Sequence, residues 1–464
     1  MSRIMLIKPF SYSDVISPPL GLGYLAANLD RSDTVMLVDG IRERLTPLKL
    51  IRKIKSFRPD VIGLSIVTSA AVRVLEDITV IRRVLPRVVI VAGGPHPSLL
   101  PAEFHANARG DIDYILRGDA ETSFRRLLHR CRNRRARDVS AQEINDLPGI
   151  WSITRDGLAS SGIPVNQECN DLGVPEWRLM PPGAYPKVPQ GVAFREFPVA
   201  PVITTRGCPF ECGFCSVAAL KGKEVRFRGQ DLITAEIRLL KRDFGVREIQ
   251  FIDDNFTMVR QHVLSVCQAM LAQNLRLPWT CPNGVRVDTL DDEIIEAMKA
   301  AGCYSVSVGL ETASPFILKR MNKHLNLEKA IDTIHRLVRQ KIEVNGFFVL
   351  GYPGDSSESI KDTIRLATQL PLTRAQFMLF TPFPGCREYE NLCRTSSSRF
   401  KYNTTFAKVA HVPDGMTATT LKRLHRRAFV EFYLRPRSAR KLLSALDSPS
   451  KMYYFLRRAV HWLV

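Results

Sequence analysis

Short apolar runs that alternate with amphipathic stretches of helical length constrain the fold of this chain more than any other sequence feature. In the first part of the chain these runs occupy residues 3–9, 34–40, 61–68, 88–94 and 113–119. Most of them end in Gly, Asp, Ser or Thr, and helical stretches separate them. Such alternation is typical of a parallel sheet with helices on both faces. We expect a doubly wound, Rossmann-like α/β domain over residues 1–137, with its ligand crevice at the carboxyl ends of the strands.

A change of character divides the chain into parts. Residues 138–199 are rich in Pro and Gly with little periodicity, so we expect a linker there. A second alternation follows, with apolar runs at residues 201–207, 248–255, 279–284, 303–311, 343–351 and 375–383. Six strand–helix units predict a partial (β/α)6 barrel of the TIM type over residues 200–390, with its active site at the carboxyl ends of the strands. We expect the basic residues 391–464 to form a helical C-terminal tail.

Three of the ten cysteines stand within eight residues, in the segment "RGCPFECGFC" directly after the first run of the second alternation. These are Cys208, Cys212 and Cys215. A structural zinc site usually takes four ligands, often as two pairs, and the other seven cysteines are scattered without a second pair. Unrelated buried thiols are a poor explanation in a segment rich in Gly and Pro. Three thiolates on an iron–sulfur cluster would leave one iron open, so the spacing indicates chemistry at that iron.

This spacing, with Phe214 before the last cysteine, resembles the radical S-adenosylmethionine (SAM) superfamily, whose catalytic fold is a partial barrel. The resemblance implies that Cys208, Cys212 and Cys215 hold a [4Fe-4S] cluster. It also implies that the free iron binds the amino and carboxylate groups of SAM, and that reduction of the cluster yields a 5'-deoxyadenosyl radical. That radical would abstract hydrogen from the substrate.

Other strand ends fit the same family pattern. Asp253 and Asp254 in "FIDDNF" follow the second strand, where the family binds the ammonium group of SAM, although the family's usual wording there is Gly-Gly-Glu. Capping of the next helix is the alternative role for either carboxylate. Ser307 and Glu311 in the fourth strand would contact the ribose and the amino-acid moiety. Gly351 in "GFFVLGYPGD" would offer a close backbone surface to the adenine.

The first domain resembles the cobalamin-binding domain that precedes such barrels, through residues 18–29, 65–69 and 93–98. The positions implied at the cofactor are Ser65, Thr68, Gly93, Gly94 and His96. Small residues after the third and fourth strands would let a corrin tail lie against the backbone, although a domain of this kind could also bind a nucleotide or nothing.

The domain departs from the family pattern at the lower cobalt ligand. The better-known domains carry Asp-x-His-x-x-Gly, whose imidazole binds cobalt, and residues 16–21 here contain neither Asp nor His. His96 lies between two prolines, so we expect a loop residue at the cofactor's edge, or a solvent-facing turn, rather than a cobalt ligand. We therefore expect cobalamin without a histidine lower ligand.

Together the two cofactors define a reaction class by resemblance. We expect an enzyme that methylates an unactivated carbon of a small molecule or lipid. The 5'-deoxyadenosyl radical would abstract a hydrogen atom from that carbon, and methylcobalamin would supply the methyl group. Relatives of this build also close rings, rearrange rings or insert oxygen, as a porphyrin cyclase does, and others modify RNA. A cobalamin- or metal-binding sensor is the non-enzymatic alternative, and the carboxylates at the strand ends argue against it. No residue is assigned to act on the substrate.

Charge and hydropathy bear on partners and location. The formal charge of +20 is concentrated in an arginine cluster at residues 125–138 and in residues 422–464. Nucleic acid, an anionic membrane surface and a solvated face are the three interpretations, and the absence of an RNA-binding module disfavours the first. No apolar run approaches the roughly 18 residues of a spanning helix. We expect a cytoplasmic protein, with its basic aromatic tail at a membrane surface, that takes electrons from a flavodoxin or ferredoxin.

Overall fold

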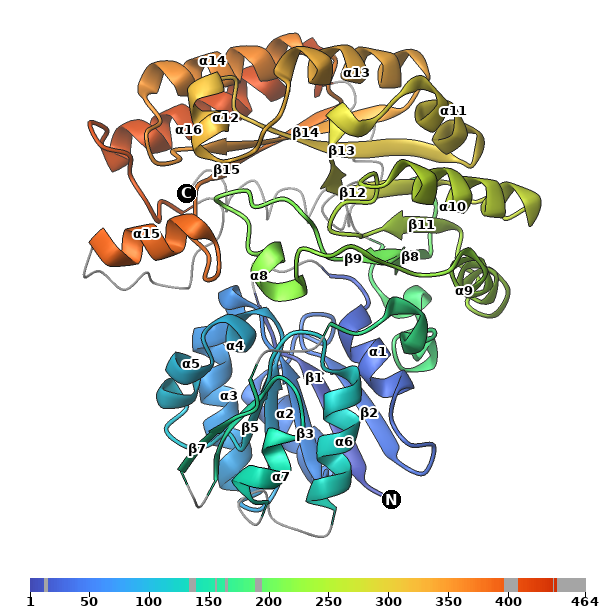
Figure 1. Cartoon of the computed structure of the whole chain (residues 1–464), viewed down its shortest axis with the longest axis vertical. Helices are drawn as coiled ribbons and strands as arrows, with labels where there is room; N and C mark the ends of the chain where they lie inside the picture. Colours follow the sequence, from blue (N-terminus) through green and yellow to red (C-terminus); the bar gives the residue numbers. More distant parts are fainter. Residues whose placement is uncertain are drawn as a thin grey trace. The chain divides into compact units, whose positions relative to one another are not determined.

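The computed structural model describes residues 1–11, 16–132, 139–154, 157–162, 166–187, 194–395, 408–436 and 438–439. The chain divides into two compact units (Figure 1). Unit 1 contains Met1–Tyr185 and Ala219–Gly222, and unit 2 contains Pro186–Ala218 and the residues from Lys223 onward. No helix among the described residues combines the length and the hydropathy needed to cross a membrane.

Unit 1 is a doubly wound α/β sheet. Its strands are β1 (Arg3–Lys8), β2 (Thr34–Asp39), β3 (Val61–Ser65), β4 (Val89–Gly93), β5 (Tyr114–Leu116), β6 (Ile150–Thr154) and β7 (Gly157–Ser160). Its helices are α1 (Leu20–Ala27), α2 (Pro47–Phe57), α3 (Ala71–Val84), α4 (Pro95–Leu99), α5 (Pro101–Asn107), α6 (Glu121–Cys131) and α7 (Ala141–Asn145), with short 3-10 turns at Thr68–Ala70, Cys169–Leu172, Trp177–Leu179 and Pro182–Ala184. The described strands pair in the order β2-β1-β3-β4-β5-β6-β7.

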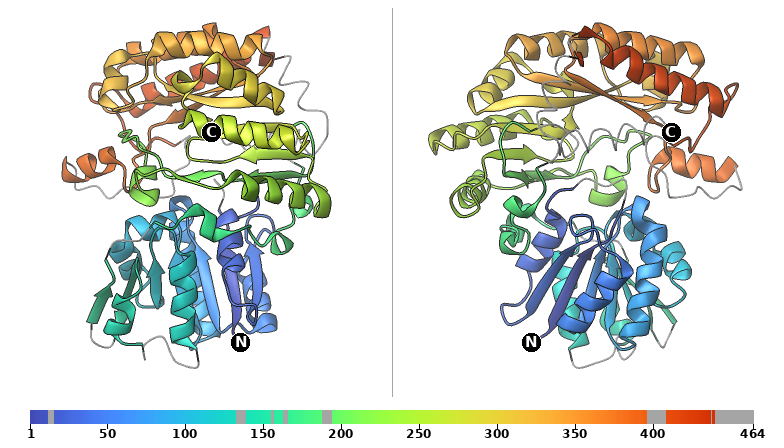
Figure 2. Two further views of the ribbon diagram at one scale, coloured as in Figure 1. Left: turned by 45° about the vertical axis from the view of Figure 1, so that its right-hand side comes forward. Right: turned by 180° about the vertical axis from the view of Figure 1, so that it is seen from behind.

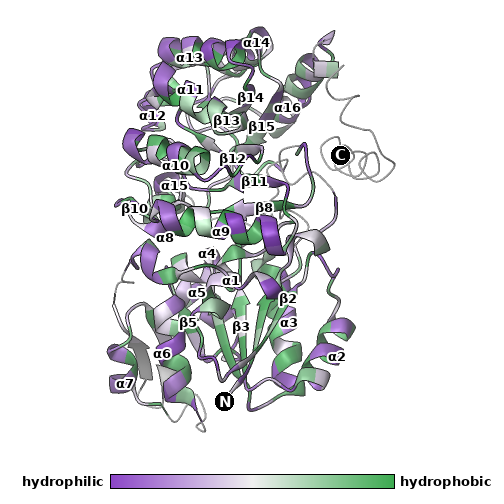
Figure 3. Ribbon diagram, turned by 90° about the vertical axis from the view of Figure 1, so that its right-hand side faces the viewer, coloured by the Kyte–Doolittle hydropathy of each residue, from purple (hydrophilic) through white to green (hydrophobic). Residues whose placement is uncertain are grey.

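The first five strands of this sheet run parallel, and the order reverses between β1 and β3. Helices α2 and α3 pack together on one face while α1 and α6 pack on the other (Figures 1 and 2). Hydrophobic residues line the strands between these helical layers (Figure 3). The reversal of strand order is the switch point at which open α/β sheets bind ligands.

Helix α2 shows how the sequence builds a layer of unit 1. Thr46 caps its first turn by accepting from the Lys49 N–H, and Pro47 occupies the first helical position, where no N–H is needed. Leu50, Ile54 and Phe57 recur at helical spacing and are buried against the sheet. The basic residues Lys49, Arg52 and Lys55 lie on the exposed side of the helix.

Residues 138–199, predicted to be a linker, contain more structure than that prediction. Strand β6 pairs antiparallel with β5, and β7 pairs antiparallel with β6, so this hairpin extends the first sheet. Their five and four residues are too short to give a periodic signal beside the Pro-rich stretch that follows.

Unit 2 holds a second sheet, whose described strands pair in the order β15-β14-β13-β12-β11-β8, all parallel. They are β8 (Val199–Val202), β11 (Glu248–Phe251), β12 (Trp279–Val285), β13 (Cys303–Glu311), β14 (Glu343–Leu350) and β15 (Arg374–Leu379), and a small antiparallel ribbon joins β9 (Thr205–Arg206) to β10 (Arg226–Phe227). In the described part of the chain β8 and β15 are the unpaired edges, so the barrel is open.

Most helices of unit 2 cover the outer face of this curved sheet (Figures 1 and 2). The helices of the unit are α9 (Gln230–Asp243), α10 (Arg260–Ala272), α11 (Asp292–Ala300), α12 (Pro315–Arg320), α13 (Leu327–Arg339), α14 (Ser357–Gln369), α15 (Arg387–Thr395) and α16 (Ala418–Tyr433), with a 3-10 turn at Val287–Thr289, and α8 (Val217–Lys221) crosses from unit 2 into unit 1. Helix α15 lies apart from the outer face (Figure 1). The predicted α/β class, with a doubly wound domain before a partial barrel, is confirmed.

The C-terminal region contributes a helix to unit 2. Helix α16 packs beside α14 and β15, where His425 Nε2 lies 3.0 Å from the Phe377 carbonyl oxygen and the Tyr433 hydroxyl donates to that of Ala375. Residues 440–464, which include the basic aromatic tail predicted at a membrane surface, lie outside the described residues.

Candidate functional site

The three cysteines lie in one loop, residues 207–216, between β9 and α8, which we call the cysteine loop. All three are partly buried. Backbone and side-chain hydrogen bonds pin this loop to distant segments: Gly213 N to Met321 O (2.7 Å), Glu388 N to Gly213 O (3.1 Å), Asn322 Nδ2 to Glu211 O (3.0 Å) and Ser216 Oγ to Pro384 O (2.8 Å). The loop's conformation is therefore set by unit 2 rather than by its own sequence.

Gly213, between the second and third cysteines, allows a close approach to the side chains of Tyr352 and Arg387. A Cβ at this position would lie 2.5 Å from Tyr352 Oη and 2.9 Å from Arg387 Nη2. The next residue, Phe214, packs against a buried apolar cluster formed by Ile317, Met321, Val349, Tyr352 and Phe380. The aromatic residue of the motif thus anchors the loop to the body of unit 2.

The three thiols are protonated at neutral pH as long as nothing binds them. Burial raises the pKa of Cys208 and of Cys212, and it raises that of Cys215 to about 12. Within the described residues, no three His, Cys, Asp or Glu side chains converge as ligands of a single metal ion. The thiolates of a [4Fe-4S] cluster bind separate irons, so three thiols on one pinned loop fit that group, and binding would release their protons.

A buried ion pair lies beside this loop. Lys323 Nζ is 2.7 Å from Glu311 Oε1, and the two side chains are 14% and 6% exposed. Burial alone would lower the pKa of Lys323, but the charge of Glu311 outweighs it and holds the pKa above its usual value. A side chain at Gly309 would strike both Glu311 and Lys323 Nζ, so this glycine makes room for the pair. Lys323 is thus a permanent cation near Cys212.

Asp253 fixes the exit of β8. Its Oδ1 accepts from the Thr204 and Thr205 N–H groups and hydroxyls, including Thr204 N at 2.8 Å, while Oδ2 has no partner within the described structure. Burial raises the pKa of Asp253 to about 6. Asp254 accepts from the N–H of Gly207, the first residue of the cysteine loop. The capping alternative is wrong, because Val259 precedes α10 at the N-cap position.

Ser307 and Gly351 occupy neighbouring strands of the second sheet. Ser307 is fully buried in β13, and its Oγ has no hydrogen-bond partner among the described residues. Gly351 follows β14 with φ of +78°, a conformation that favours glycine, and its N–H donates to Asp355 Oδ2. Asp253 Oδ2 and Ser307 Oγ are buried groups that still lack partners, as expected where a polar cofactor binds.

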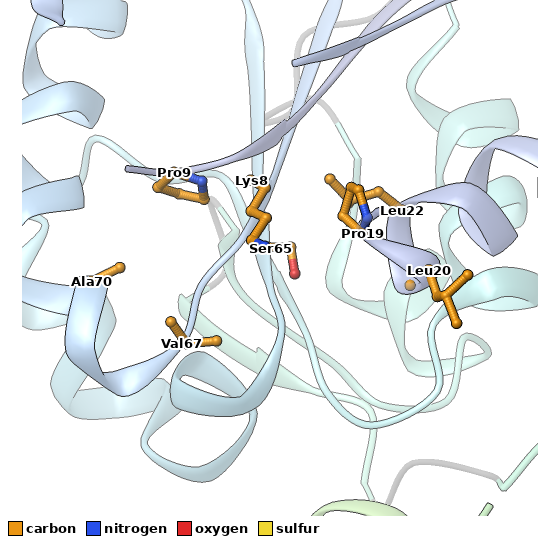
Figure 4. A pocket seen from close by; sticks show the side chains of 9 residues that line it. Lys8, Pro9, Pro19, Leu20, Leu22, Ser65, Val67 and Ala70 are labelled. Atoms are coloured by element: carbon orange, nitrogen blue, oxygen red, sulfur yellow. The ribbon is translucent and has the colours of Figure 1, made fainter. Parts of the chain in front are cut away.

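In unit 1 a cavity of about 200 Å³ opens at the switch point between β1 and β3 (Figure 4). Its lining comes from the ends of these strands and from the start of α1, and consists of Lys8, Pro9, Pro19, Leu20, Gly21, Leu22, Ser65, Val67 and Ala70. None of these described lining residues is a histidine. The cavity is mostly apolar with backbone nearby, which suits the edge of a large flat cofactor.

Of the predicted cobalamin positions, Ser65 lines this cavity, whereas Thr68, Gly93, Gly94 and His96 are not among its lining residues. Gly94 has φ of +89°, and a Cβ there would lie 2.7 Å from Ile66 N, so it holds the loops after β3 and β4 together. His96 is only 2% exposed, lies in α4 and packs edge-on against Phe104. The alternative of a solvent-facing turn is therefore wrong for His96.

Sequence reasoning missed several residues that the fold brings to these sites. Lys8 and Pro9 follow β1 at the switch point, and the topology alone could have indicated them. Lys323, Arg387 and Tyr352 contact the cysteine loop only through tertiary packing. No local sequence pattern indicates that these three residues lie at the site.

Comparisons with known proteins agree with this geometry. The model of the radical SAM superfamily matches residues 202–367, and that of the B12 binding domain matches residues 12–128. The uncharacterized methyltransferase PH0819 of Pyrococcus horikoshii is 31% identical over 452 residues, which cover 94% of this chain and 93% of that protein. The anaerobic magnesium-protoporphyrin IX monomethyl ester cyclase of Rubrivivax gelatinosus is 25% identical over 401 residues, covering 84% and 70%.

Among solved structures, TsrM, a radical SAM methyltransferase from Kitasatospora setae with cobalamin and a [4Fe-4S] cluster bound, superposes with a TM-score of 0.69. The identity is 18%, and the superposition covers 91% of this chain and 81% of that one. This likeness concerns the fold of both units.

Proposed function

This chain belongs to the family of cobalamin-dependent radical SAM methyltransferases, and on that premise we propose that it methylates an unactivated carbon of a small molecule. The observation that carries the proposal is the presence in one chain of a pinned three-cysteine loop at the start of a parallel barrel and a cavity at the switch point of a doubly wound sheet. The family resemblance inferred from the sequence is confirmed.

The residues available for each cofactor are separate. Cys208, Cys212 and Cys215 would hold the cluster, with Phe214 anchoring their loop. SAM would take Asp253, Asp254, Ser307, Glu311 and Gly351, and cobalamin would lie against the cavity bordered by Ser65, without a histidine lower ligand. When bound, these cofactors supply a hydrogen-abstracting radical and a transferable methyl group.

The chain's own side chains prepare the barrel for this chemistry. Burial holds the pKa of the Cys212 thiol above its usual value, while the nearby charge of Lys323 favours the thiolate and that of Glu311 opposes it. Asp253 holds Thr204 and Thr205, and so fixes where the cysteine loop begins. Both carboxylates, Asp253 and Glu311, would face the ammonium group of SAM as counter-charges.

We propose the domain limits 1–137, 138–199, 200–390 and 391–464 for the cobalamin-binding part, the connecting part, the barrel and the basic C-terminal region. An external electron donor such as flavodoxin or ferredoxin would reduce the cluster. Peripheral membrane contact would involve the basic C-terminal region, and a lipid is the alternative to a small-molecule substrate. In the arginine cluster, Arg132 pairs with Asp30 at 2.8 Å and with Asp33 at 3.2 Å. Such pairing leaves less free positive charge for nucleic acid.

The test is anaerobic reconstitution with iron, sulfide and hydroxocobalamin, followed by incubation with SAM and a reductant and mass spectrometry of the products. We expect both 5'-deoxyadenosine and S-adenosylhomocysteine. Deoxyadenosine alone, with cobalamin bound, would favour a ring-closing reaction of the kind named for the Rubrivivax relative.

The matched control is Cys212→Ala. It should abolish deoxyadenosine formation while cobalamin binding by unit 1 survives, because the cavity in unit 1 contains no cysteine. Persistent deoxyadenosine formation by this variant would show that the cysteine loop is not the radical centre.

A further inference from the structure

A row of buried polar side chains crosses four adjacent strands of the second sheet. Its members, which we call the polar row, are Gln250 in β11, Thr280 in β12, Ser305 and Ser307 in β13, and Asn345 in β14. The strand register pairs Gln250 with Thr280, Thr280 with Ser305, and Ser307 with Asn345. Since partners in register and residues two apart share one face of a sheet, all five side chains lie on the same face.

The opposite face of these strands carries apolar residues that pack under the helices. Phe251 and Trp279 are in edge-to-face contact there, and the Trp279 indole donates to the Ala301 carbonyl at the end of α11. Because side chains alternate along a strand, the polar row lies on the inner, concave face of the open barrel.

Four atoms of the polar row have no hydrogen-bond partner within the described residues: Gln250 Nε2, Thr280 Oγ1, Ser307 Oγ and Asn345 Oδ1. The four residues are 3%, 1%, 0% and 4% exposed. The one hydrogen bond inside the row runs from Asn345 Nδ2 to Ser305 Oγ at 3.0 Å. Each unpaired buried polar group costs about 1–3 kcal/mol, so four of them in one row are not explained by folding stability.

The position of the row relates it to the cysteine end of the barrel. Ser307 is four residues before Glu311 on β13, and Gln250 is three residues before Asp253. At a rise of about 3.3 Å per residue, these members of the row lie roughly 10–13 Å below the carboxylates at the strand ends. A molecule that reached from the strand ends into the barrel would place its far end at the row.

The chemistry of the row defines what it can bind. Gln250 Nε2 donates, Asn345 Oδ1 accepts, and the hydroxyls of Thr280 and Ser307 do either. The row contains no charged side chain, and Glu248, two residues before Gln250 on the same face, already accepts from the Tyr304 hydroxyl and from the Arg195 and Glu196 N–H groups. A buried carboxylate or ammonium group would therefore lack a free counter-charge there. An uncharged group that both donates and accepts hydrogen bonds satisfies these atoms.

We propose that Gln250, Thr280 and Asn345, the members of the polar row with unpaired atoms that are not assigned to SAM, form the specificity site for the methyl acceptor and bind an uncharged, amide-like group of that molecule. The substrate is then a polar small molecule that enters with its amide-like end first, rather than a hydrocarbon chain. This inference rests on the proposed function and adds the substrate class to it. Sites built to bind a polar group reject analogues that lack it, because the site's own polar atoms stay unpaired.

The first test uses stability and needs no substrate. Thr280→Val replaces the unpaired hydroxyl with a methyl group of the same shape, and it should raise the thermal midpoint of the full chain. The matched control is Thr234→Val in α9, whose equally buried hydroxyl donates to the Gln230 carbonyl at 2.9 Å. That control should lower the midpoint. A lower midpoint for Thr280→Val would show that the hydroxyl is structural and overturn the proposal.

The second test measures binding with small probes by ligand-observed NMR on the full chain. Benzamide carries a neutral amide, benzoate a charge of the same shape, and toluene neither. We expect benzamide to bind more tightly than benzoate and toluene, and its affinity to fall at least tenfold in Thr280→Val and Gln250→Leu. Equal binding of toluene, or unchanged benzamide binding in the variants, would overturn the proposal.

The affinity for SAM separates the two possible occupants of the row. It should be unchanged in Thr280→Val and Gln250→Leu, measured by calorimetry on the reconstituted protein. A parallel loss of SAM affinity would assign the row to SAM and overturn the proposal. None of these outcomes bears on the products formed by the wild-type enzyme. The proposed function is therefore tested independently, by the product analysis of the reconstituted protein.

Discussion

Gly213→Ala tests how closely the side chains of unit 2 pack against the cysteine loop. The added Cβ would lie 2.5 Å from Tyr352 Oη and 2.9 Å from Arg387 Nη2, against an ordinary contact of 3.4–4 Å. The Arg387 guanidinium ends a flexible, half-exposed chain and can move aside. Tyr352 cannot, because it is fully buried and its hydroxyl donates to Glu388 Oε1 at 3.1 Å. The loop must therefore shift by about 1 Å, at a cost of about 1–3 kcal/mol.

We expect Gly213→Ala to bind less than half of the wild-type iron after anaerobic reconstitution, measured as iron per chain and by visible absorbance. Tyr352→Phe removes the clashing oxygen at the cost of one hydrogen bond. In that background the alanine should cost little, which gives a favourable coupling of about 1–2 kcal/mol in a double-mutant cycle of unfolding free energies.

A glycine without close neighbours provides the control. A Cβ added at Gly21 would meet no heavy atom within 4 Å, so Gly21→Ala should leave the iron content unchanged. The reasoning is refuted if Gly213→Ala binds as much iron as the wild type, or if Tyr352→Phe brings no recovery.

Three further perturbations address other parts of the chain. Val67→Trp should fill the cavity in unit 1 and weaken hydroxocobalamin binding at least tenfold at unchanged iron content, measured by absorbance titration; retained binding would place the cofactor elsewhere. Glu236→Gln should lower the free energy of unfolding in urea by about 3–5 kcal/mol, because it removes the negative charge that lies 2.6 Å from the fully buried Arg228 guanidinium. A loss below about 1 kcal/mol would contradict this. Burial lowers the pKa of His96 to about 4, whereas an exposed histidine in the unfolded chain protonates near 6.5. As the pH falls from 6.5 to 4, protons bind the unfolded chain more tightly than the folded one, so the folded state loses stability. Through this group the wild type should lose up to about 3 kcal/mol of unfolding free energy between pH 7 and pH 4, and His96→Phe should not show this loss. Equal losses in urea unfolding of the two proteins would contradict the lowered pKa of His96.

The strands of the barrel could be predicted from the sequence because their signal is local. The apolar run at residues 303–311 coincides with β13, in which the hydrophobic residues Val306, Val308 and Leu310 alternate with smaller or polar ones, as expected of a strand. The hairpin of β6 and β7 escaped prediction because each strand is short and draws its stability from pairing with β5, which is distant in sequence.

The site was predictable only where spacing carries the chemistry. Cys208, Cys212 and Cys215 are fixed by their mutual distances along the chain, whereas Lys323 acts through a contact with Glu311 that only the folded turn after α12 creates. Asp253 was placed at the correct strand end, but its bonds to Thr204 and Thr205 span almost fifty residues. Its anchoring role was therefore invisible in the sequence.

The crossing of Ala219–Gly222 into unit 1 limits how this protein can be recombined with its relatives. Lys221 forms an ion pair with Asp119 at 3.0 Å, and a Cβ on Gly222 would lie 2.6 Å from Asn166 Nδ2. In a chimera that takes only residues 1–185 from a relative, the native Lys221 would face the relative's residue in place of Asp119. A fragment that stops at Tyr185 would lack Lys221 altogether. Only Ser216, Val217 and Ala218 separate Cys215 from this crossing. The cobalamin module is therefore not a contiguous cassette, and any graft must carry residues 219–222 with it, directly beside the last cluster ligand.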